Sequence, residues 1–482
     1  MFMVRYRTPS LPCGTIAAME IRITNIEYLL SGTAIERDRE ILIRDGLIAE
    51  VGTGVGSDAG DPPGDTGIDA TVIDATGMAV MPSFKNAHTH AAMTLLRGYG
   101  DDMPLQPWLT ERIWPAEAVL TPDDIYWGTR LAAIEMIRSG TTFANDMYFM
   151  PAETIRAFRD SGMRAAVGLA LFDFDDPQRR RREQAAAEQL LASFDPTTDP
   201  PRSDVSGEPA GTVTRTGHPP RVFLTVAPHS PYTSSAELLS WAAELAASQN
   251  LVYHTHLSET RTEVNQILDR HGYTPFAWLE SLGVFEKTGE RTIAAHGVWI
   301  TPEELALAAR RGITVAHNPA SNMKLASGAF PYGEYKRHGI PLMLAPDGVA
   351  SNNNLDMFDE MKLAALMQKL HTGDATALPA AEILRIAWGA RSEVFRDFGV
   401  SGSISPGEPA DLVLVDLSHP QMTPVHTIES NLVYAANGSV VDTVICGGEI
   451  LMLHREIPGQ DEVIREARNC AASLVKRAGA GA

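Results

Sequence analysis

The chain has 482 residues, of which 44% are hydrophobic and 21% are charged, and this ordinary composition excludes a wholly disordered protein. Lys and Arg number 40 and Asp and Glu number 60, so the formal net charge is −20. Such an acidic protein disfavours nucleic-acid polymers and anionic membranes as partners, while small neutral substrates remain open. No apolar run reaches the about 18 residues of a membrane span, so we expect no membrane association.

The three cysteines, Cys13, Cys446 and Cys470, are far apart in the sequence. This spacing excludes a CxxC zinc site and a disulfide framework, and it favours a reducing, cytoplasmic location. Residues 1–18 contain two arginines but lack the apolar centre of a signal peptide. We expect these residues to form a disordered extension or to reflect an upstream start codon.

Both ends of the chain contain short β-branched runs. Residues 19–81 include EILIRDGLIAEVG, in which Asp-Gly marks a turn, and residues 403–455 include PADLVLVDL. The two ends are therefore expected to form one small β-domain around a central insertion. Residues 456–482 are predicted to form a C-terminal helix and tail.

The central part, residues 82–402, alternates between strands and helices. Strands are predicted at 221–229, 251–257, 291–297, 312–319 and 340–348, and helices at 235–249, 301–311 and 355–370. In the last but one of these helices, Thr301 is the predicted N-cap and Pro302 the first helical residue. Repeated alternation predicts parallel strands, in a closed (β/α)8 barrel or an open doubly wound sheet. No GxGxxG follows a strand, which disfavours a dinucleotide-binding sheet.

One segment interrupts this alternation. Residues 179–194 predict a helix whose four arginines, 179–182, are interpreted as a solvated face, with ligand binding as the alternative. Residues 195–220 are rich in Pro, Gly, Ser and Thr, which predicts a long mobile loop near the barrel rim.

Histidine and aspartate follow several predicted strands. The residues are His88 and His90 in NAHTH, His229 in APHS, His256 in HTHLSE, His296 in AAHG and Asp347 in APDG. In a (β/α)8 barrel the C-terminal ends of all strands face one pocket. Two imidazoles at i and i+2 of a strand lie on one face and can bind one metal ion. Imidazole and carboxylate without thiolate suit zinc or iron and leave a position for water.

The later residues leave alternatives open. His254 and His256 form a second HxH, and spacing alone does not decide between them, although His256 is nearer the rim. Glu259 is placed as a proton shuttle or as a helix-start residue. Asp347 is a metal ligand and proton acceptor, or a turn residue before Gly348.

Two more histidines have ordinary structural alternatives. His296 is a site residue or a satisfied core histidine, and His317 is a site residue or one that holds its own loop.

These motifs together resemble the amidohydrolase superfamily, and more closely the 5′-methylthioadenosine/S-adenosylhomocysteine deaminase family. The matching stretches are NAHTHAAMTLLRGYGDDMPLQPWLTERIWPAE (86–117), SGTTFANDMY (139–148), APHSPYT (227–233), THLSET (255–260), HNPASNMKLASG (317–328) and DGVASNNNLDMFDEMKLAAL (347–366). The resemblance implies an α/β fold, a (β/α)8 TIM-type barrel with a small β-sandwich formed by both chain ends.

The resemblance also implies a role for each site residue. One divalent metal ion per subunit, zinc or else iron, is held by His88, His90, His256 and Asp347. Asp347, Glu259 and His296 are catalytic: Asp347 accepts a proton from water, Glu259 shuttles protons, and His296 orients the water. Substrate is also bound by Glu117, through the ribose hydroxyls, and by His229.

The activity implied by this family is hydrolytic deamination at C6 of adenosine-type nucleosides. Candidate substrates are 5′-methylthioadenosine, 5′-deoxyadenosine, adenosine and S-adenosylhomocysteine, and the products are the inosine analogue and ammonia. The alternative is an aminohydrolase of another heterocycle, of pterin, guanine or triazine type. A small-molecule substrate is thus the expected partner, and a homo-oligomer is the expected assembly.

One departure from the family bears on the substrate. Leu169, in LALFD, stands where the family has an arginine expected to bind the carboxylate of S-adenosylhomocysteine. Loss of a guanidinium from such a clamp favours neutral 5′ substituents, unless one of Arg179 to Arg182 replaces it.

Overall fold

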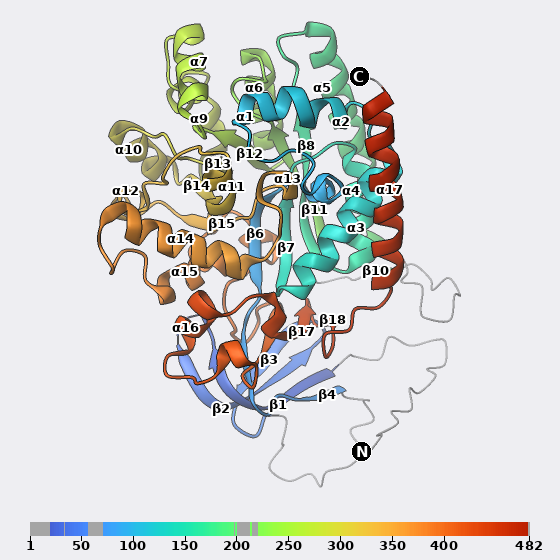
Figure 1. The fold of residues 1–482 in the computed structure, drawn as a ribbon, viewed down its shortest axis with the longest axis vertical. Helices are drawn as coiled ribbons and strands as arrows, with labels where there is room; N and C mark the ends of the chain where they lie inside the picture. Colours follow the sequence, from blue (N-terminus) through green and yellow to red (C-terminus); the bar gives the residue numbers. More distant parts are fainter. Residues whose placement is uncertain are drawn as a thin grey trace.

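The structure is a computed structural model that describes residues 20–32, 34–55, 71–196, 198–199, 213–214 and 220–480. The predicted extension, 1–18, and most of the predicted loop, 195–220, lie outside the described residues. A barrel of strands surrounded by helices occupies the upper part of the molecule in Figure 1, and a separate sheet lies below it. Within the described ranges, no helix is long and apolar enough to cross a membrane.

The barrel consists of eight parallel strands. They are β6 (Phe84–Thr89), β7 (Thr141–Asp146), β8 (Arg164–Leu171), β11 (Val222–Pro228), β12 (Val252–Leu257), β13 (Thr292–His296), β14 (Thr314–His317) and β15 (Leu342–Leu344). Each strand pairs with the next in chain order, and β15 returns to contact β6, so the sheet nearly closes. The prediction of a (β/α)8 barrel is confirmed, and the open doubly wound sheet is excluded.

The barrel interior is filled by one apolar side chain from each strand. These are Ala87, Phe143, Ala166, Phe223, Val252, Ile293, Ala316 and Met343. Phe398 stacks on Phe223 with ring centroids 3.9 Å apart. The N-terminal part of the barrel is thus a packed core, which leaves the C-terminal ends of the strands for a site.

Helices surround the barrel. The longer ones are α3 (Pro122–Arg138), α4 (Pro151–Ser161), α5 (Pro177–Ser193), α6 (Ala236–Ser248), α7 (Arg261–His271), α10 (Pro302–Arg311), α14 (Met357–Thr372) and α15 (Ala380–Ala387). The predicted helices at 235–249, 301–311 and 355–370 correspond to α6, α10 and α14. Thr301 caps α10, and Glu304 completes a reciprocal capping box with it.

Short helices connect these elements. They are α1 (Leu105–Trp108), α2 (Trp114–Glu117), α8 (Pro275–Ser281), α9 (Val284–Thr288), α11 (Pro319–Lys324), α12 (Tyr332–Arg337), α13 (Val349–Asn352) and α16 (Ile428–Ser430). A π-helical turn, η2 (Leu109–Ile113), joins α1 to α2. These three pieces lie across the top of the barrel in Figure 1.

The second sheet combines both ends of the chain. Its strand order is β18-β17-β16-β5-β1-β2-β3, with β4 paired to β1. The strands are β1 (Glu20–Leu30), β2 (Ile35–Arg44), β3 (Leu47–Gly52), β4 (Thr71–Asp74), β5 (Met78–Pro82), β16 (Leu412–Asp416), β17 (Val441–Cys446) and β18 (Glu449–Met452). Buried side chains from both ends, among them Ile21, Ile41, Leu412 and Ile445, share one core.

Buried charges join this sheet to the N-terminal ends of the barrel strands. The ammonium of Lys85, at the start of β6, lies 2.7 Å from Ser83 Oγ and 3.4 Å from Asp411 Oδ2. Arg164 of β8 also approaches Asp411 Oδ2, at 3.6 Å. The C-terminal helix α17 (Gln460–Ala480) packs along α3 on the barrel wall, as Figure 1 shows. The opposite, C-terminal end of the barrel therefore remains available.

Candidate active site

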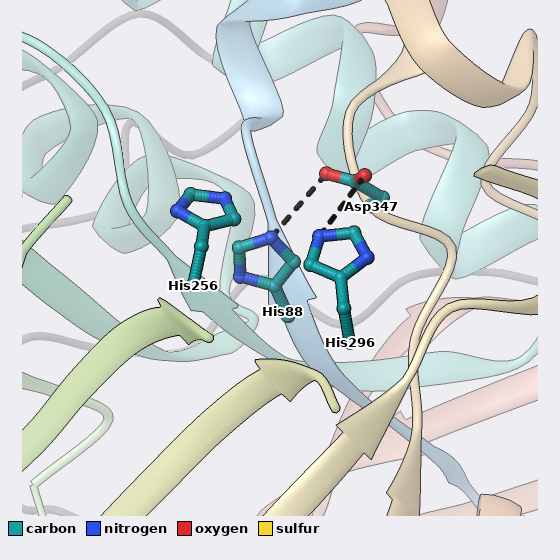
Figure 2. Close-up of side chains that lie close together, drawn as sticks. All are labelled: His88, His256, His296 and Asp347. Carbon is teal, nitrogen blue, oxygen red and sulfur yellow. Dashed lines mark ion pairs between the residues drawn. The ribbon is translucent and has the colours of Figure 1, made fainter. Parts of the chain in front are cut away.

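Four side chains from four strand ends converge at the C-terminal end of the barrel (Figure 2). His88 belongs to β6, His256 to β12 and His296 to β13, and Asp347 follows β15. One nitrogen or oxygen atom from each lies within 4.8 Å of the others, and all four residues are buried. The predicted meeting of strand-end His and Asp residues is therefore present.

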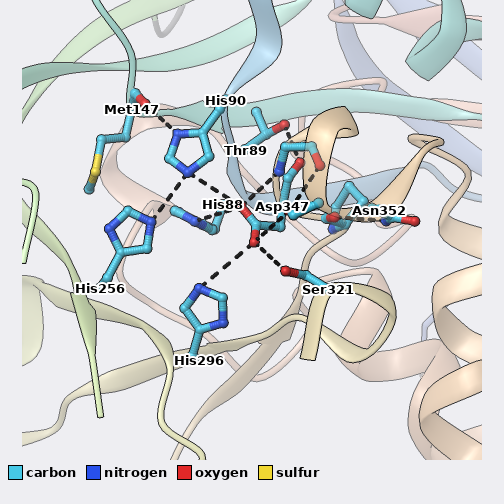
Figure 3. A network of polar contacts seen from close by, with 12 residues as sticks. His88, Thr89, His90, Met147, His256, His296, Ser321, Asp347 and Asn352 are labelled. Atoms are coloured by element: carbon cyan, nitrogen blue, oxygen red, sulfur yellow. Dashed lines mark hydrogen bonds and ion pairs between the residues drawn. The ribbon is translucent and has the colours of Figure 1, made fainter. Parts of the chain in front are cut away.

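His90, the residue directly after β6, faces the same point (Figure 3). Its Nε2 lies 3.3 Å from Asp347 Oδ1 and 3.2 Å from His256 Nε2. His88 Nε2 is also 3.3 Å from Asp347 Oδ1. The two histidines of NAHTH therefore present their Nε2 atoms to one carboxylate oxygen, as the i, i+2 spacing predicts.

The tautomers of two histidines follow from their backbone partners. His90 Nδ1–H donates to the carbonyl of Met147 at 2.6 Å, and His256 Nδ1–H donates to the carbonyl of His229 at 2.6 Å. A carbonyl oxygen only accepts, so the ring proton of each neutral imidazole is on Nδ1. In the neutral rings, the two Nε2 atoms, 3.2 Å apart, each direct a lone pair towards the other, so this space takes either a proton or a metal ion. This arrangement fits a cation held between imidazoles and a carboxylate.

The charge balance of the cluster also favours a cation. Burial alone would lower the pKa of His90, but the hydrogen bond to Asp347 and its negative charge raise that pKa to about 9. Burial lowers the pKa of His88 to about 4 and that of His256 well below its usual value. Burial would raise the pKa of Asp347, yet its contacts with His88 and His90 hold it well below the ordinary range. One positive charge beside Asp347 is therefore favoured.

Asp347 is held firmly in place. Ser321 Oγ–H donates to Oδ2 at 2.6 Å, and the amide of Gly348 donates to Oδ1 at 2.7 Å. Asp347 has a φ of +65°, and His296 and Ser258 have φ values of +75° and +53°. Left-handed backbone at non-glycine residues costs about 1–3 kcal/mol each and gathers at functional sites.

His296 and Glu259 lie side by side on the wall of the cluster. His296 Nδ1–H donates to Asn322 Oδ1 at 2.9 Å, which leaves Nε2 at 3.9 Å from Glu259 Oε2 and 3.8 Å from Asp347 Oδ2. Ser327 Oγ–H donates to Glu259 Oε1 at 3.2 Å. Burial raises the pKa of Glu259, so its protonated form is more accessible than that of an exposed carboxyl.

Two residues that hold His296 and Glu259 in place were not predicted from the sequence. Glu263 accepts the backbone amides of Ser258 at 3.1 Å and of Glu259 at 2.6 Å, and so holds the loop that carries Glu259. Its signal was present, because Thr260 and Glu263 have the spacing of a capping box. Asn322, which orients His296, lies far away in the sequence and gave no comparable local signal.

A cavity of about 350 Å³ opens above the cluster. Its base is polar and includes His90, His256, Glu259, His296 and Asp347, whereas its wall is largely aromatic, with Trp108, Trp114, Phe149, Phe172 and Phe174. Such a cavity, mostly apolar with few convergent polar groups, is typical of a small-molecule site.

Glu117 and His229 also line the cavity. Glu117 ends α2 in the segment across the barrel top, and burial raises its pKa to about 7. His229 follows β11, with Nδ1 3.0 Å from Thr233 Oγ1, and burial lowers its pKa to about 3. All predicted site residues are thus gathered in one place.

The two remaining strand histidines, His254 and His317, have different surroundings. His254 is fully buried, with Nε2 2.9 Å from Nδ1 of His88, and does not line the cavity, whereas His256 does. His317 is buried at the end of β14, where it stacks on Phe330 with ring centroids 4.1 Å apart. It is a core side chain.

Two expectations about the cavity wall were wrong. Leu169 is 2% exposed and packs in the core, whereas Ala170 and Phe172 line the cavity. Position 169 points away from the substrate space because strand side chains alternate. Arg181 and Arg182 are exposed, as predicted, whereas the Arg179 side chain is 34% exposed and also lines the cavity, with its guanidinium 4.3 Å from the Phe172 ring centroid. Arg180, next to it, pairs with Asp173 at 3.3 Å.

The nearly closed parallel barrel and its cluster of histidines and aspartate define a barrel protein with a candidate metal site at the C-terminal end. Residues 79–451 match the Amidohydrolase family, and the chain belongs to this family, as the sequence motifs predicted.

Several relatives are similar over nearly the whole chain. A 5′-deoxyadenosine deaminase of Methanoregula boonei is 46% identical over 410 residues, which cover 84% of this chain and 87% of the relative. A 5-methylthioadenosine/S-adenosylhomocysteine deaminase of Pelotomaculum thermopropionicum is 41% identical, covering 92% and 95%. A solved adenosine deaminase of Xanthomonas campestris with bound zinc has a TM-score of 0.81 and 33% identity, covering 95% and 98%.

Proposed function

We propose that this protein is a metal-dependent deaminase of adenosine-type nucleosides. It hydrolyses the bond between C6 and the amino group and releases ammonia and the inosine analogue. The observation that carries this proposal is the convergence of His88, His90, His256 and Asp347 beside Glu259, at the base of an apolar cavity. The names of the relatives support the same reaction and substrate class.

One divalent ion, zinc in our proposal with iron as the alternative, is held by His88, His90, His256 and Asp347. His90 is preferred to His296 as the fourth ligand because it lies 3.3 Å from Asp347 Oδ1, whereas His296 Nε2 lies 3.8 Å from Oδ2. When bound, such an ion lowers the pKa of water and makes a nucleophile available near neutral pH. The zinc in the related adenosine deaminase structure supports this choice.

The chain's own groups move the protons. Asp347 Oδ2 accepts a proton as the water oxygen bonds to C6. His296 Nε2 lies 3.8 Å from Asp347 Oδ2. It accepts a hydrogen bond from the water molecule and so orients that molecule. Protonated Glu259 donates to the purine ring nitrogen beside C6, and a second proton transfer lets ammonia leave. The raised pKa of Glu259 suits a group that must donate and then accept.

Two further residues bind the nucleoside. The carboxylate of Glu117 can accept from both ribose hydroxyls, since one carboxylate offers two oxygens. Neutral His229, whose pKa burial lowers to about 3, lies at the cavity wall as a hydrogen-bonding group without charge. Neither residue is a proposed metal ligand. Their positions suit contacts with the ribose, which lies away from the reacting C6 atom.

The cavity wall favours a neutral 5′ substituent. Aromatic and aliphatic side chains form most of the lining, and Arg179 contributes a guanidinium to it. Arg179 already pairs with Glu183 at 3.7 Å, so its charge is partly balanced. We therefore propose 5′-deoxyadenosine, 5′-methylthioadenosine and adenosine as better substrates than S-adenosylhomocysteine.

An ammonia-release screen over these four nucleosides, with a panel of aminated pterins, guanine and triazines lacking ribose, tests the proposal. Turnover of the neutral adenosines is expected, together with one equivalent of zinc or iron by elemental analysis. Turnover confined to the heterocycles without ribose, with no effect of Glu117→Gln, would instead establish the alternative aminohydrolase.

We further propose that the protein is a cytoplasmic homo-oligomer with no nucleic-acid or membrane partner. The scarcity of cysteine and the net charge of −20 support this environment. Light scattering on the purified protein checks the assembly, and a monomer would contradict it.

A further inference from the structure

His254 lies directly beneath the proposed metal ligands. It belongs to β12 and is fully buried, and its Nε2 lies 2.9 Å from Nδ1 of His88. Its own Nδ1 lies 3.2 Å from Nδ2 of Asn145 in β7, and that amide nitrogen donates to the carbonyl of Ala87 at 2.9 Å. Side chains from β6, β7 and β12 therefore form a buried chain of hydrogen bonds inside the barrel that ends on His88.

The partner of His88 differs in kind from those of the other two imidazole ligands. His90 and His256 donate from Nδ1 to backbone carbonyls, whereas His88 faces another side chain. For Nε2 of His88 to offer its lone pair to a metal ion, the ring proton must sit on Nδ1. The acceptor for that proton is Nε2 of His254.

Asn145 can complete this arrangement. When His254 accepts at Nε2, its own proton is on Nδ1 and needs an acceptor. Oδ1 of Asn145 is buried without a hydrogen-bond partner among the described residues. A rotation of the amide would turn this oxygen towards Nδ1 of His254, in exchange for the hydrogen bond that Nδ2 donates to the carbonyl of Ala87. The chain thus contains an acceptor for the tautomer that a metal-bound His88 requires.

We propose that His254 is a positioning residue that fixes the ring orientation and tautomer of His88, so that Nε2 of His88 faces the metal ion. This inference rests on the proposed function, because it requires the metal site. Outer hydrogen bonds of this kind typically contribute 10- to 100-fold to metal affinity.

The test measures zinc affinity, by competition between the metal-free protein and a chromophoric chelator. His254→Phe keeps a ring but removes the acceptor, and we expect it to bind zinc roughly 10- to 100-fold more weakly than the wild type. His317→Phe is the matched control, because His317 is another buried strand histidine and neither of its nitrogens has a hydrogen-bond partner. It should bind zinc like the wild type. His254→Gln, whose amide oxygen can accept from His88, should recover most of the loss.

Wild-type zinc affinity in His254→Phe, or an equal loss in His317→Phe, would overturn the inference. If the phenylalanine variant does not fold, His254→Gln and His254→Asn decide, since the shorter amide cannot reach His88 and only the longer one should preserve affinity. Failure of the wild type to bind any divalent ion would overturn the proposed function itself. Zinc binding that is indifferent to residue 254 would overturn only the present inference.

Discussion

The two ends of the barrel differ in the partners of their buried aspartates. At the N-terminal end, Asp411 is matched by Lys85 and Arg164, and the amide of Gly447 donates to its Oδ1 at 2.7 Å. At the C-terminal end, Asp347 faces the Nε2 atoms of His88 and His90, both at 3.3 Å, and within the described ranges it has no ion pair with a lysine or arginine. A carboxylate paired with permanent cations holds the two parts of the protein together, whereas a carboxylate that faces imidazoles can share a metal ion with them.

The largest expected effect is at the C-terminal end. Glu259→Gln removes the proposed proton carrier, and kcat for ammonia release should fall by about 10²–10⁴. Metal content and thermal stability should remain near wild type, because Glu259 is not a proposed ligand. Glu286→Gln, a change on an exposed face of α9, is the matched control and should retain full activity. Normal turnover in Glu259→Gln would remove Glu259 from the mechanism.

The next effect belongs to the N-terminal end. Asp411→Asn leaves two buried cations without their anion, and we expect a loss of about 3–5 kcal/mol in the free energy of unfolding, measured with urea. Asp374→Asn, at an exposed turn, should change this free energy by no more than about 0.5 kcal/mol. The folded Asp411 variant should still bind zinc. A specific loss of activity with unchanged stability would contradict the division between the two ends.

Asp411, at the N-terminal end of the barrel, should make the stability of the protein depend on pH. Burial would raise the pKa of Asp411, but Lys85 and Arg164 lower it to about 2, below the value of about 3.9 in an unfolded chain. Its stabilisation is therefore complete above about pH 4 and is lost as the pH falls towards 2. Between these pH values, the free energy of unfolding of the wild type should fall more steeply with decreasing pH than that of Asp411→Asn. Parallel curves would show that Asp411 carries no such shift.

The smallest expected effect concerns the cavity wall. Arg179→Gln removes the lining cation, so kcat/KM for S-adenosylhomocysteine should fall about tenfold, while 5′-deoxyadenosine changes by less than about threefold. Arg181→Gln, in the same run of arginines but outside the cavity lining, is the control. Equal losses for both substrates would mean that Arg179 has no part in recognising a carboxylate.

The sequence predicted the ranges of five of the eight barrel strands, β11 to β15, and the histidines and aspartate that follow strands, because strand periodicity and strand ends are local features. It did not predict which face of β8 lines the cavity. Alternation assigns Leu169 and Ala170 to opposite faces but does not say which one is inward, and a shift of one residue exchanges them. Arg179 was misassigned for a related reason, because a run of charges looks the same whether it faces water or a cavity.

The supporting contacts were least accessible to sequence reasoning. The contact between His254 and His88 joins residues 166 positions apart, and that between His296 and Asn322 crosses from β13 to α11. The first pair meets across the barrel interior, because β12 and β6 are not neighbours in the sheet. Only the folded chain shows them.

Ammonia release from 5′-deoxyadenosine and 5′-methylthioadenosine, measured on purified protein of known metal content, decides whether the protein is a metal-dependent nucleoside deaminase. We expect turnover of both nucleosides in proportion to one bound divalent ion per chain, with loss of turnover on chelation and recovery on adding zinc. Absence of turnover by fully metal-loaded protein, or undiminished turnover by metal-free protein, would contradict it.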